Sequence, residues 1–168
     1  NGTLLDRRDL FETMVDNMTW VRFSIDAGTP ETYNHIRRAK GNQGRDKMVN
    51  NLNTLIKVNK DKGKKIGIGV GFVITPDTCH EVVDFAKFFA DIDVDYCQYK
   101  PEIVNRERED GVQRDLEFWN KNVEPQLEAA KEILGSKFQI NGYKLSDLIE
   151  DRSLFGRRYK KCMGSQIQ

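Results

Sequence analysis

The sequence lacks the features that mark membrane, secreted and nucleic-acid-binding proteins. It contains no run of 18 or more apolar residues, so no transmembrane helix is expected, and no basic, apolar leader of the secretory kind. Its 27 Lys and Arg residues are balanced by 26 Asp and Glu residues, which leaves a net charge of +1. Nucleic acids and anionic membranes are usually bound by clustered basic residues, so we expect neither as a partner.

Cysteine and histidine are also scarce. Cys79, Cys97 and Cys162 cannot form a complete set of disulfides, which favours a reducing, cytoplasmic location. His35 and His80 have no partner at metal-binding spacing, so we expect them to be surface or capping residues. The length of 168 residues suits one domain.

What the sequence does contain is an alternation of strand and helix patterns. β-branched and aromatic runs predict strands, and apolar residues at helical spacing predict amphipathic helices between them. Strands separated by helices pair in parallel through right-handed crossovers. The sequence therefore predicts an α/β fold, either part of a (β/α) barrel or a small open sheet. The predicted strands are 20–25, 66–74 and 94–100, and the predicted helices are the second half of 4–18, 30–38, 45–62 and 82–89.

Several residues predict where these elements begin and end. Thr29 followed by proline is typical of a helix N-cap, and Gly63 stands where the helix 45–62 should stop. Residues 78–81 (TCHE) match a capping box before the next helix. Further along, a helical pattern over 111–134 should break near Asn122 because proline follows at position 125; residues 138–140 could form a short strand.

Candidate binding residues lie at the strand ends, since ligands of parallel α/β sheets gather at their carboxyl ends. Ser24 and Asp26 share one strand face and could hold a ribose, or could instead make a local cap and an Asx turn. Arg37, one short helix later, could return to pair with a carboxylate or phosphate, or could be solvated. Lys100 could contact a substrate or solvent.

Glycine is concentrated on one face of the predicted strand 66–74. Gly67, Gly69 and Gly71 alternate with large apolar residues, and glycine in a strand interior weakens the strand. Three on one face therefore indicate that something bulky approaches it closely. This could be a ligand inside a barrel, or a neighbouring helix or aromatic side chain.

The order of these motifs resembles the radical S-adenosylmethionine (SAM) enzymes. Residues 21–33 (VRFSIDAGTPETY), followed by Arg37, resemble the fourth strand and following helix of that family. Residues 1–5 (NGTLL) resemble the "TNG" turn after its third strand, and 71–76 and 94–101 resemble strands five and six. Residues 162–165 (CMGS) resemble the first cysteine of a SPASM or twitch extension, which binds auxiliary iron–sulfur clusters.

The resemblance implies a domain organisation and a set of site residues. Residues 1–101 would be the C-terminal half of a partial (β/α)6 TIM-like barrel with parallel strands, 102–160 a helical insertion or connector, and 161–168 the start of the auxiliary extension. Carried over by position, Ser24, Asp26, Arg37, Gly71 and Gln98 would bind SAM, Lys100 would bind the substrate, and Cys162 would be a ligand of an auxiliary iron–sulfur cluster.

The family's reaction uses a [4Fe–4S] cluster and an electron donor to cleave SAM into a 5′-deoxyadenosyl radical, which abstracts hydrogen from a small-molecule or peptide substrate. The family's CxxxCxxC loop and glycine-rich "GGEP" strand are absent from this chain. We therefore interpret it as an internal fragment, inactive alone, whose exposed sheet edge favours self-association. Two alternatives are another (β/α)-barrel enzyme using Lys100 as a base or Schiff-base former, and a non-catalytic module that binds a partner through 102–134.

Overall fold

The computed structural model describes residues 2, 3, 5, 7–37, 44–101 and 117–140, and the structural statements below concern these residues. Strands and helices alternate through them, so the predicted α/β class is confirmed. The strands are β1 (Trp20–Ser24), β2 (Gly67–Ile74), β3 (Tyr96–Pro101) and β4 (Phe138–Ile140). The α-helices are α1 (Arg8–Asn17), α2 (Pro30–Arg37), α3 (Gly44–Asp61), α4 (Val82–Ala90) and α6 (Glu124–Leu134).

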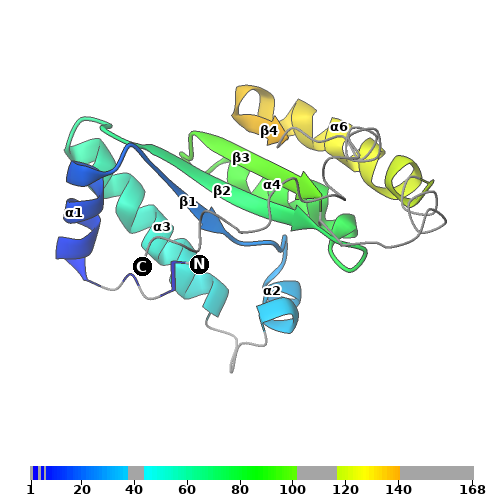
Figure 1. Ribbon diagram of the computed structural model, residues 1–168, viewed down its shortest axis with the longest axis horizontal. Coiled ribbons are helices and arrows are strands. Elements are labelled where there is room, and N and C mark those ends of the chain that lie inside the picture. The colour runs from blue at the N-terminus through cyan, green and yellow to red at the C-terminus, as the bar shows by residue number, and fades with distance from the viewer. Residues whose placement is uncertain (1, 4, 6, 38–43, 102–116, 141–168) are drawn as a thin grey trace, which may run out of the picture.

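The four strands form one parallel sheet in the order β1-β2-β3-β4 (Figure 1). The three main strands lie where the sequence predicted them, and the short strand at 138–140 is present as β4. Each strand pairs with the next one along the chain, so every connection is a helical crossover between neighbours. The connection from β3 to β4 contains α6, and this part of the predicted helical connector therefore adds a strand to the sheet.

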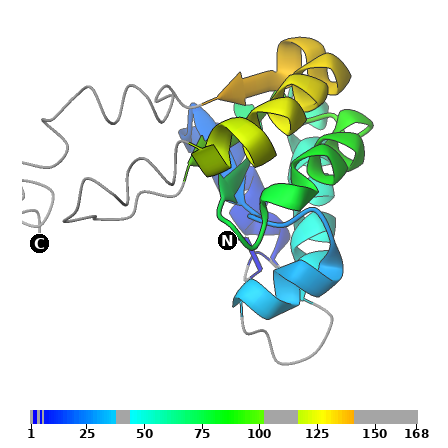
Figure 2. The ribbon, with the colours of Figure 1, turned by 90° about the vertical axis from the view of Figure 1, so that its right-hand side faces the viewer.

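One face of the sheet is buried against helices and contains the core. Figure 2 shows α3, α4 and α6 on the same side of the strands. Tyr99 packs there against Phe72 and Phe85, with ring centroids 5.8 and 5.5 Å away, and donates a hydrogen bond from its hydroxyl to the Val82 carbonyl. Burying each such side chain contributes about 1.5–3 kcal/mol. The buried hydrophobic residues of the strands are Phe23, Ile68, Val70, Phe72, Ile74, Cys97 and Tyr99.

The opposite face of the sheet is polar and rich in glycine. Its side chains alternate with the buried ones, and most of them are only partly covered. This face includes Arg22, Ser24, Gly69, Gly71, Tyr96, Gln98 and Lys100. In the described part of the chain, no helix is long and apolar enough to cross a membrane.

Three of the predicted element ends are confirmed. Thr29 caps α2, since its hydroxyl accepts a hydrogen bond of 3.3 Å from the Thr32 amide. Gly63 follows α3 with φ of +85°, a conformation that glycine adopts without strain. The break before Pro125 takes the form of a π-helical segment, η2 (Trp119–Val123), from which α6 continues.

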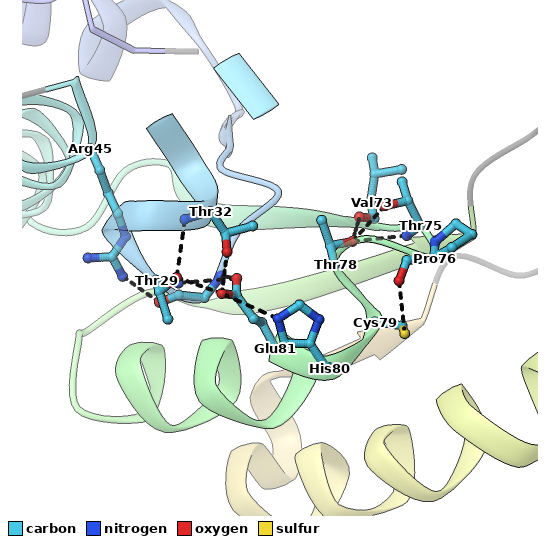
Figure 3. Close-up of polar contacts among 11 residues, drawn as sticks. Thr29, Thr32, Arg45, Val73, Thr75, Pro76, Thr78, Cys79, His80 and Glu81 are labelled. Carbon is cyan, nitrogen blue, oxygen red and sulfur yellow. Dashed lines mark hydrogen bonds and ion pairs between the residues drawn. The ribbon is translucent and has the colours of Figure 1, made fainter. Parts of the chain in front are cut away.

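The predicted capping box at 78–81 is wrong. The Thr78 hydroxyl accepts a hydrogen bond from the Thr75 amide and donates one to the Val73 carbonyl, which closes the turn after β2 instead of capping a helix. The Glu81 carboxylate turns away to the start of α2 (Figure 3). The Glu81 carboxylate therefore accepts hydrogen bonds from donors at the start of α2, and not from the local backbone amide that it would bind in a capping box. The predicted extension at 161–168, with Cys162, lies outside the described residues.

Candidate functional site

Three of the predicted SAM-binding residues lie side by side on the polar face. Ser24 on β1 pairs with Gly71 on β2, and Gly71 pairs with Gln98 on β3. Gln139 on β4 extends the same row to the fourth strand. Neighbouring strands lie about 4.8 Å apart, so the row spans a distance that one nucleoside-sized ligand could cover. The structure places these residues together, and their predicted role in binding SAM stays a prediction.

Arg22 crosses this row above Gly71. Its guanidinium Nη1 donates a hydrogen bond to the side-chain oxygen of Gln98, two strands away. A Cβ atom at position 71 would lie 3.3 Å from the Arg22 Cδ atom and 3.4 Å from its Nε atom. Glycine at this position therefore gives the arginine side chain room to pass. Sequence reasoning missed Arg22 because nothing in its strand pattern separates it from a solvated residue.

Gly69 accommodates an aromatic ring. A Cβ atom at this position would lie 2.2 Å from the ring of Tyr96 on the neighbouring strand. Of the interpretations left open for the glycine face, packing of a neighbouring aromatic side chain is the one observed at Gly69. Gly67 has no such close neighbour, because its nearest described atom would be 3.8 Å away.

Asp26 and Arg37 form an ion pair at the carboxyl end of β1. The other Asp26 oxygen, Oδ1, accepts a hydrogen bond of 3.0 Å from the Val73 amide, and Arg37 also donates to the Ser24 carbonyl at 3.2 Å. Asp26 has φ of +60°, a left-handed conformation that aspartate tolerates better than most residues. The pair fixes the turn after β1, and Arg37 does return over the strand end.

Lys100 follows Gln98 on the same face of β3 and pairs with Val73 across the sheet. Its side chain is partly buried. Burial lowers the pKa of the amine, the Arg22 guanidinium lowers it further, and the Asp26 carboxylate acts in the opposite direction. Lys100 therefore belongs to the same electrostatic cluster as the Arg22–Gln98 bridge, and its predicted contact with substrate stays a prediction.

Glu81 holds the start of α2 and was missed by the sequence analysis. Its carboxylate accepts hydrogen bonds from the Gly28 amide at 2.8 Å, the Thr29 amide at 3.3 Å, and the hydroxyls of Thr29 and Thr32 at 2.5 Å each (Figure 3). Burial raises its pKa, but these donors outweigh burial and hold the pKa below the usual value. Because α2 ends at Arg37, Glu81 contributes to the position of the Asp26–Arg37 pair.

Arg45 holds the same turn from the opposite direction. It is only 5% exposed, lies over the ring of Phe88 with 4.2 Å from its Cζ atom to the centroid, and donates to the Gly28 carbonyl at 2.9 Å. A Cβ atom at Gly28 would lie 2.8 Å from the Glu81 carbonyl oxygen, so the turn has no room for a larger residue. These contacts have a structural role, because they stabilise the turn at Gly28 and so support the candidate site.

The described residues do not fit an iron–sulfur cluster. Such a cluster needs several cysteine thiolates, whereas Cys97 is fully buried and burial raises its pKa to about 12. Cys79 is also buried, and burial raises the pKa of its thiol. Within the described ranges, no three His, Cys, Asp or Glu residues are grouped as metal ligands would be.

Comparison with known proteins adds no relative to these observations. No model of a protein family matches the chain, and no curated protein matches it. The candidate site is therefore defined by its geometry alone. Its parts are the row of Ser24, Gly71 and Gln98, the Arg22 side chain above that row, and the Asp26–Arg37 pair beside it.

Proposed function

We propose that this chain forms part of the SAM-binding barrel of a radical SAM enzyme. The observation that carries the proposal is the row of Ser24, Gly71 and Gln98 on three adjacent parallel strands, in which Ser24 ends β1 and its partners lie within β2 and β3. Each of these residues was assigned to SAM from a separate sequence motif. Their alignment on one face supports a common ligand, which would reach from the carboxyl end of β1, where ligands of parallel sheets bind, across the polar face to β3.

We further propose that the sheet belongs to a partial (β/α)6 barrel. Its strands follow one another in chain order, as barrel strands do, whereas doubly wound open sheets reverse their order at a switch point. The faces of the sheet also differ strongly. An open sheet with helices on both sides has two apolar faces, while this sheet has one apolar face and one face of Arg22, Ser24, Gln98 and Lys100.

Within this proposal, hydroxyl and amide groups of the row bind the ribose of SAM. Among the described residues the Ser24 hydroxyl has no hydrogen-bond partner, so it is available to a ligand. Gln98 offers its amide nitrogen while its oxygen is held by Arg22. Asp26 and Arg37 keep the end of β1 in place. The described residues provide no ligands for the [4Fe–4S] cluster, and no radical step is assigned to them.

Binding of SAM to the full chain tests the proposal. Isothermal titration calorimetry should give saturable binding, and Ser24→Ala should weaken it several-fold because one hydrogen bond contributes about 0.5–1.5 kcal/mol. Ser136→Ala, at an exposed position in η3 (Gly135–Lys137), is the matched control and should bind as the unchanged chain does. Absence of saturable binding, or equal binding by Ser24→Ala, would contradict the proposal.

A second candidate function is supported by the environment of Lys100. An amine whose pKa is lowered by burial and by a neighbouring cation is a better nucleophile near neutral pH than a solvated lysine. This is the setting that a Schiff-base-forming barrel enzyme uses. Borohydride reduction in the presence of a carbonyl compound should then attach that compound to Lys100 and not to the exposed Lys87. Labelling of both lysines to the same extent would exclude this candidate.

A further inference from the structure

Two cationic side chains lie near each other on the polar face of the sheet. Arg22 comes from β1 and Lys100 from β3, and Arg22 reaches over β2 toward β3. The two are close enough for the guanidinium to lower the pKa of the Lys100 amine. Like charges at such separation repel each other, so the arrangement carries an energetic cost unless an anion lies between or above them.

No carboxylate in the described part of the chain pairs with either cation. The hydrogen-bond partner of Arg22 is the neutral amide of Gln98. The Asp26 carboxylate raises the pKa of Lys100, but Arg37 and the Val73 amide already bind both of its oxygens. The local charge of these four ionisable groups is therefore positive.

We propose that Arg22 and Lys100 together bind an oxyanion, a carboxylate or phosphate group carried by the substrate. This inference rests on the proposed function, in that it places the substrate beside the row assigned to SAM. A guanidinium presents a planar fork of N–H donors that suits both kinds of anion, and an ammonium adds a compact charge. The remaining guanidinium N–H groups of Arg22 are not used by any described residue.

The local geometry holds the arginine in place for this role. Gln98 accepts from one guanidinium nitrogen and so fixes the direction of the fork, while Gly71 leaves the space through which the side chain passes. Arg22 also lies near the Tyr96 phenol, whose pKa burial raises and the guanidinium lowers. A flexible, solvated arginine would need none of these contacts, so the site is ordered before an anion arrives.

Titration of the full chain with inorganic phosphate, without SAM, tests the inference. The NMR signal of the Lys100 ε-methylene should shift with saturation, because a bound anion stabilises the charged amine. Arg22→Gln should weaken phosphate binding at least about tenfold, because it removes the charged donor of a charge-assisted hydrogen bond. The control is Arg8→Gln, which removes an arginine whose side chain is 81% exposed and should leave the titration unchanged.

A second variant and a second anion test the oxyanion site further. Lys100→Gln, followed by calorimetry, should weaken phosphate binding as Arg22→Gln does, and circular dichroism verifies that each variant is folded. A parallel titration with acetate compares the affinities for the two anions. The anion that binds more tightly indicates whether the substrate group is a phosphate or a carboxylate. A linear shift without saturation, or equal binding by Arg22→Gln, would overturn the inference. Phosphate binding without SAM binding would reject only the proposed function, and the converse would reject only the oxyanion site.

Discussion

Arg22 and Gln98 connect the first and third strands of the sheet across the second. The arginine Nη1 donates to the glutamine Oε1, and the arginine side chain passes over Gly71, whose missing side chain leaves the path open. The glycine pattern is visible in the sequence, whereas the role of the arginine is not. Both are parts of one structural feature. The glycines on this face differ in what lies over them, and this difference can be measured.

Alanine substitution at the three β2 glycines should give graded effects on stability. Gly69→Ala should destabilise most, by about 1–3 kcal/mol, because its Cβ would lie 2.2 Å from the Tyr96 ring, which must shift. Gly71→Ala should cost less, because its nearest atoms, in the Arg22 side chain, would lie 3.3–3.4 Å away and need to shift only slightly. Gly67→Ala serves as the control and should be neutral or stabilising, since alanine is more favourable than glycine inside a strand.

Urea unfolding followed by circular dichroism measures this series. From most to least stable, the order should be Gly67→Ala, then Gly71→Ala, then Gly69→Ala. If Gly69→Ala were as stable as Gly67→Ala, the Tyr96 ring would not lie over Gly69, and the packing explanation for the glycine would be wrong.

Asn59 should be among the most sensitive polar residues of α3. Its amide donates to the Ile66 carbonyl at 2.8 Å and accepts from the Ile66 amide at 3.1 Å, so it replaces a strand partner just before β2. Asn59→Ala leaves two buried backbone groups unsatisfied and should lower the free energy of unfolding by about 2–4 kcal/mol. The exposed Asn53 on the same helix is the control, and Asn53→Ala should change stability by less than about 0.5 kcal/mol. Similar losses for both variants would contradict the assigned role of Asn59.

The two described cysteines should resist alkylation in the folded protein. Cys97 is fully buried and burial raises its pKa to about 12, so almost no thiolate is present near neutral pH. Iodoacetamide treatment and peptide mass spectrometry should find Cys79 and Cys97 unmodified in the native state and modified in guanidinium chloride. Rapid native labelling of Cys97 would indicate that β3 is not packed as described.

The sequence predicted the strands and most helices because their signals are local. Alternation in Gly67–Ile74, the Thr29 cap and the Gly63 stop each depend on a few neighbouring residues, and the structure has them where expected. The contacts that build the site are not local. Glu81 lies more than 50 residues from Gly28 along the chain, so its four donors could not be read from its neighbours, and the local capping box was predicted instead.

The same limit applies to the site residues. From sequence, Ser24 and Gln98 could be placed near strand ends and Gly71 on the glycine face of its strand, but only the register shows that they share one row. Arg22 stands two residues before Ser24 and was overlooked, because the residue that gives it a role is 76 positions away. Long-range side-chain pairs of this kind depend on the assembled sheet.

The β1 edge should allow two chains to associate. In the described sheet β1 has a neighbour on one side only, and an exposed parallel edge offers unpaired backbone groups to another strand. Trp20, 59% exposed at the start of β1, adds apolar area to this edge. Sedimentation velocity should show concentration-dependent dimers or larger species, and Trp20→Lys should reduce them because charge blocks edge pairing. Met18→Lys, outside the strand, is the control; a monomer at all concentrations would contradict the prediction.

The Glu81 carboxylate should make the stability of the protein depend on pH in the acidic range. Its pKa is lower in the folded chain than the ordinary value of 4.5, so its stabilising effect is complete above about 4.5 and is lost as the pH falls through the folded pKa. Glu81→Gln removes the charge that Gly28, Thr29 and Thr32 bind, and near neutral pH it should lower the free energy of unfolding by about 2 kcal/mol.

The difference between the unchanged chain and Glu81→Gln separates this effect from general acid unfolding. Because the glutamine cannot titrate, the difference in unfolding free energy should shrink as the pH falls below about 4.5. Urea titrations at several pH values measure it, with the exposed Glu128→Gln as the control, whose difference should stay close to zero throughout. A Glu81→Gln difference that stays constant with pH would mean that the loss comes from packing and not from the charge at the start of α2.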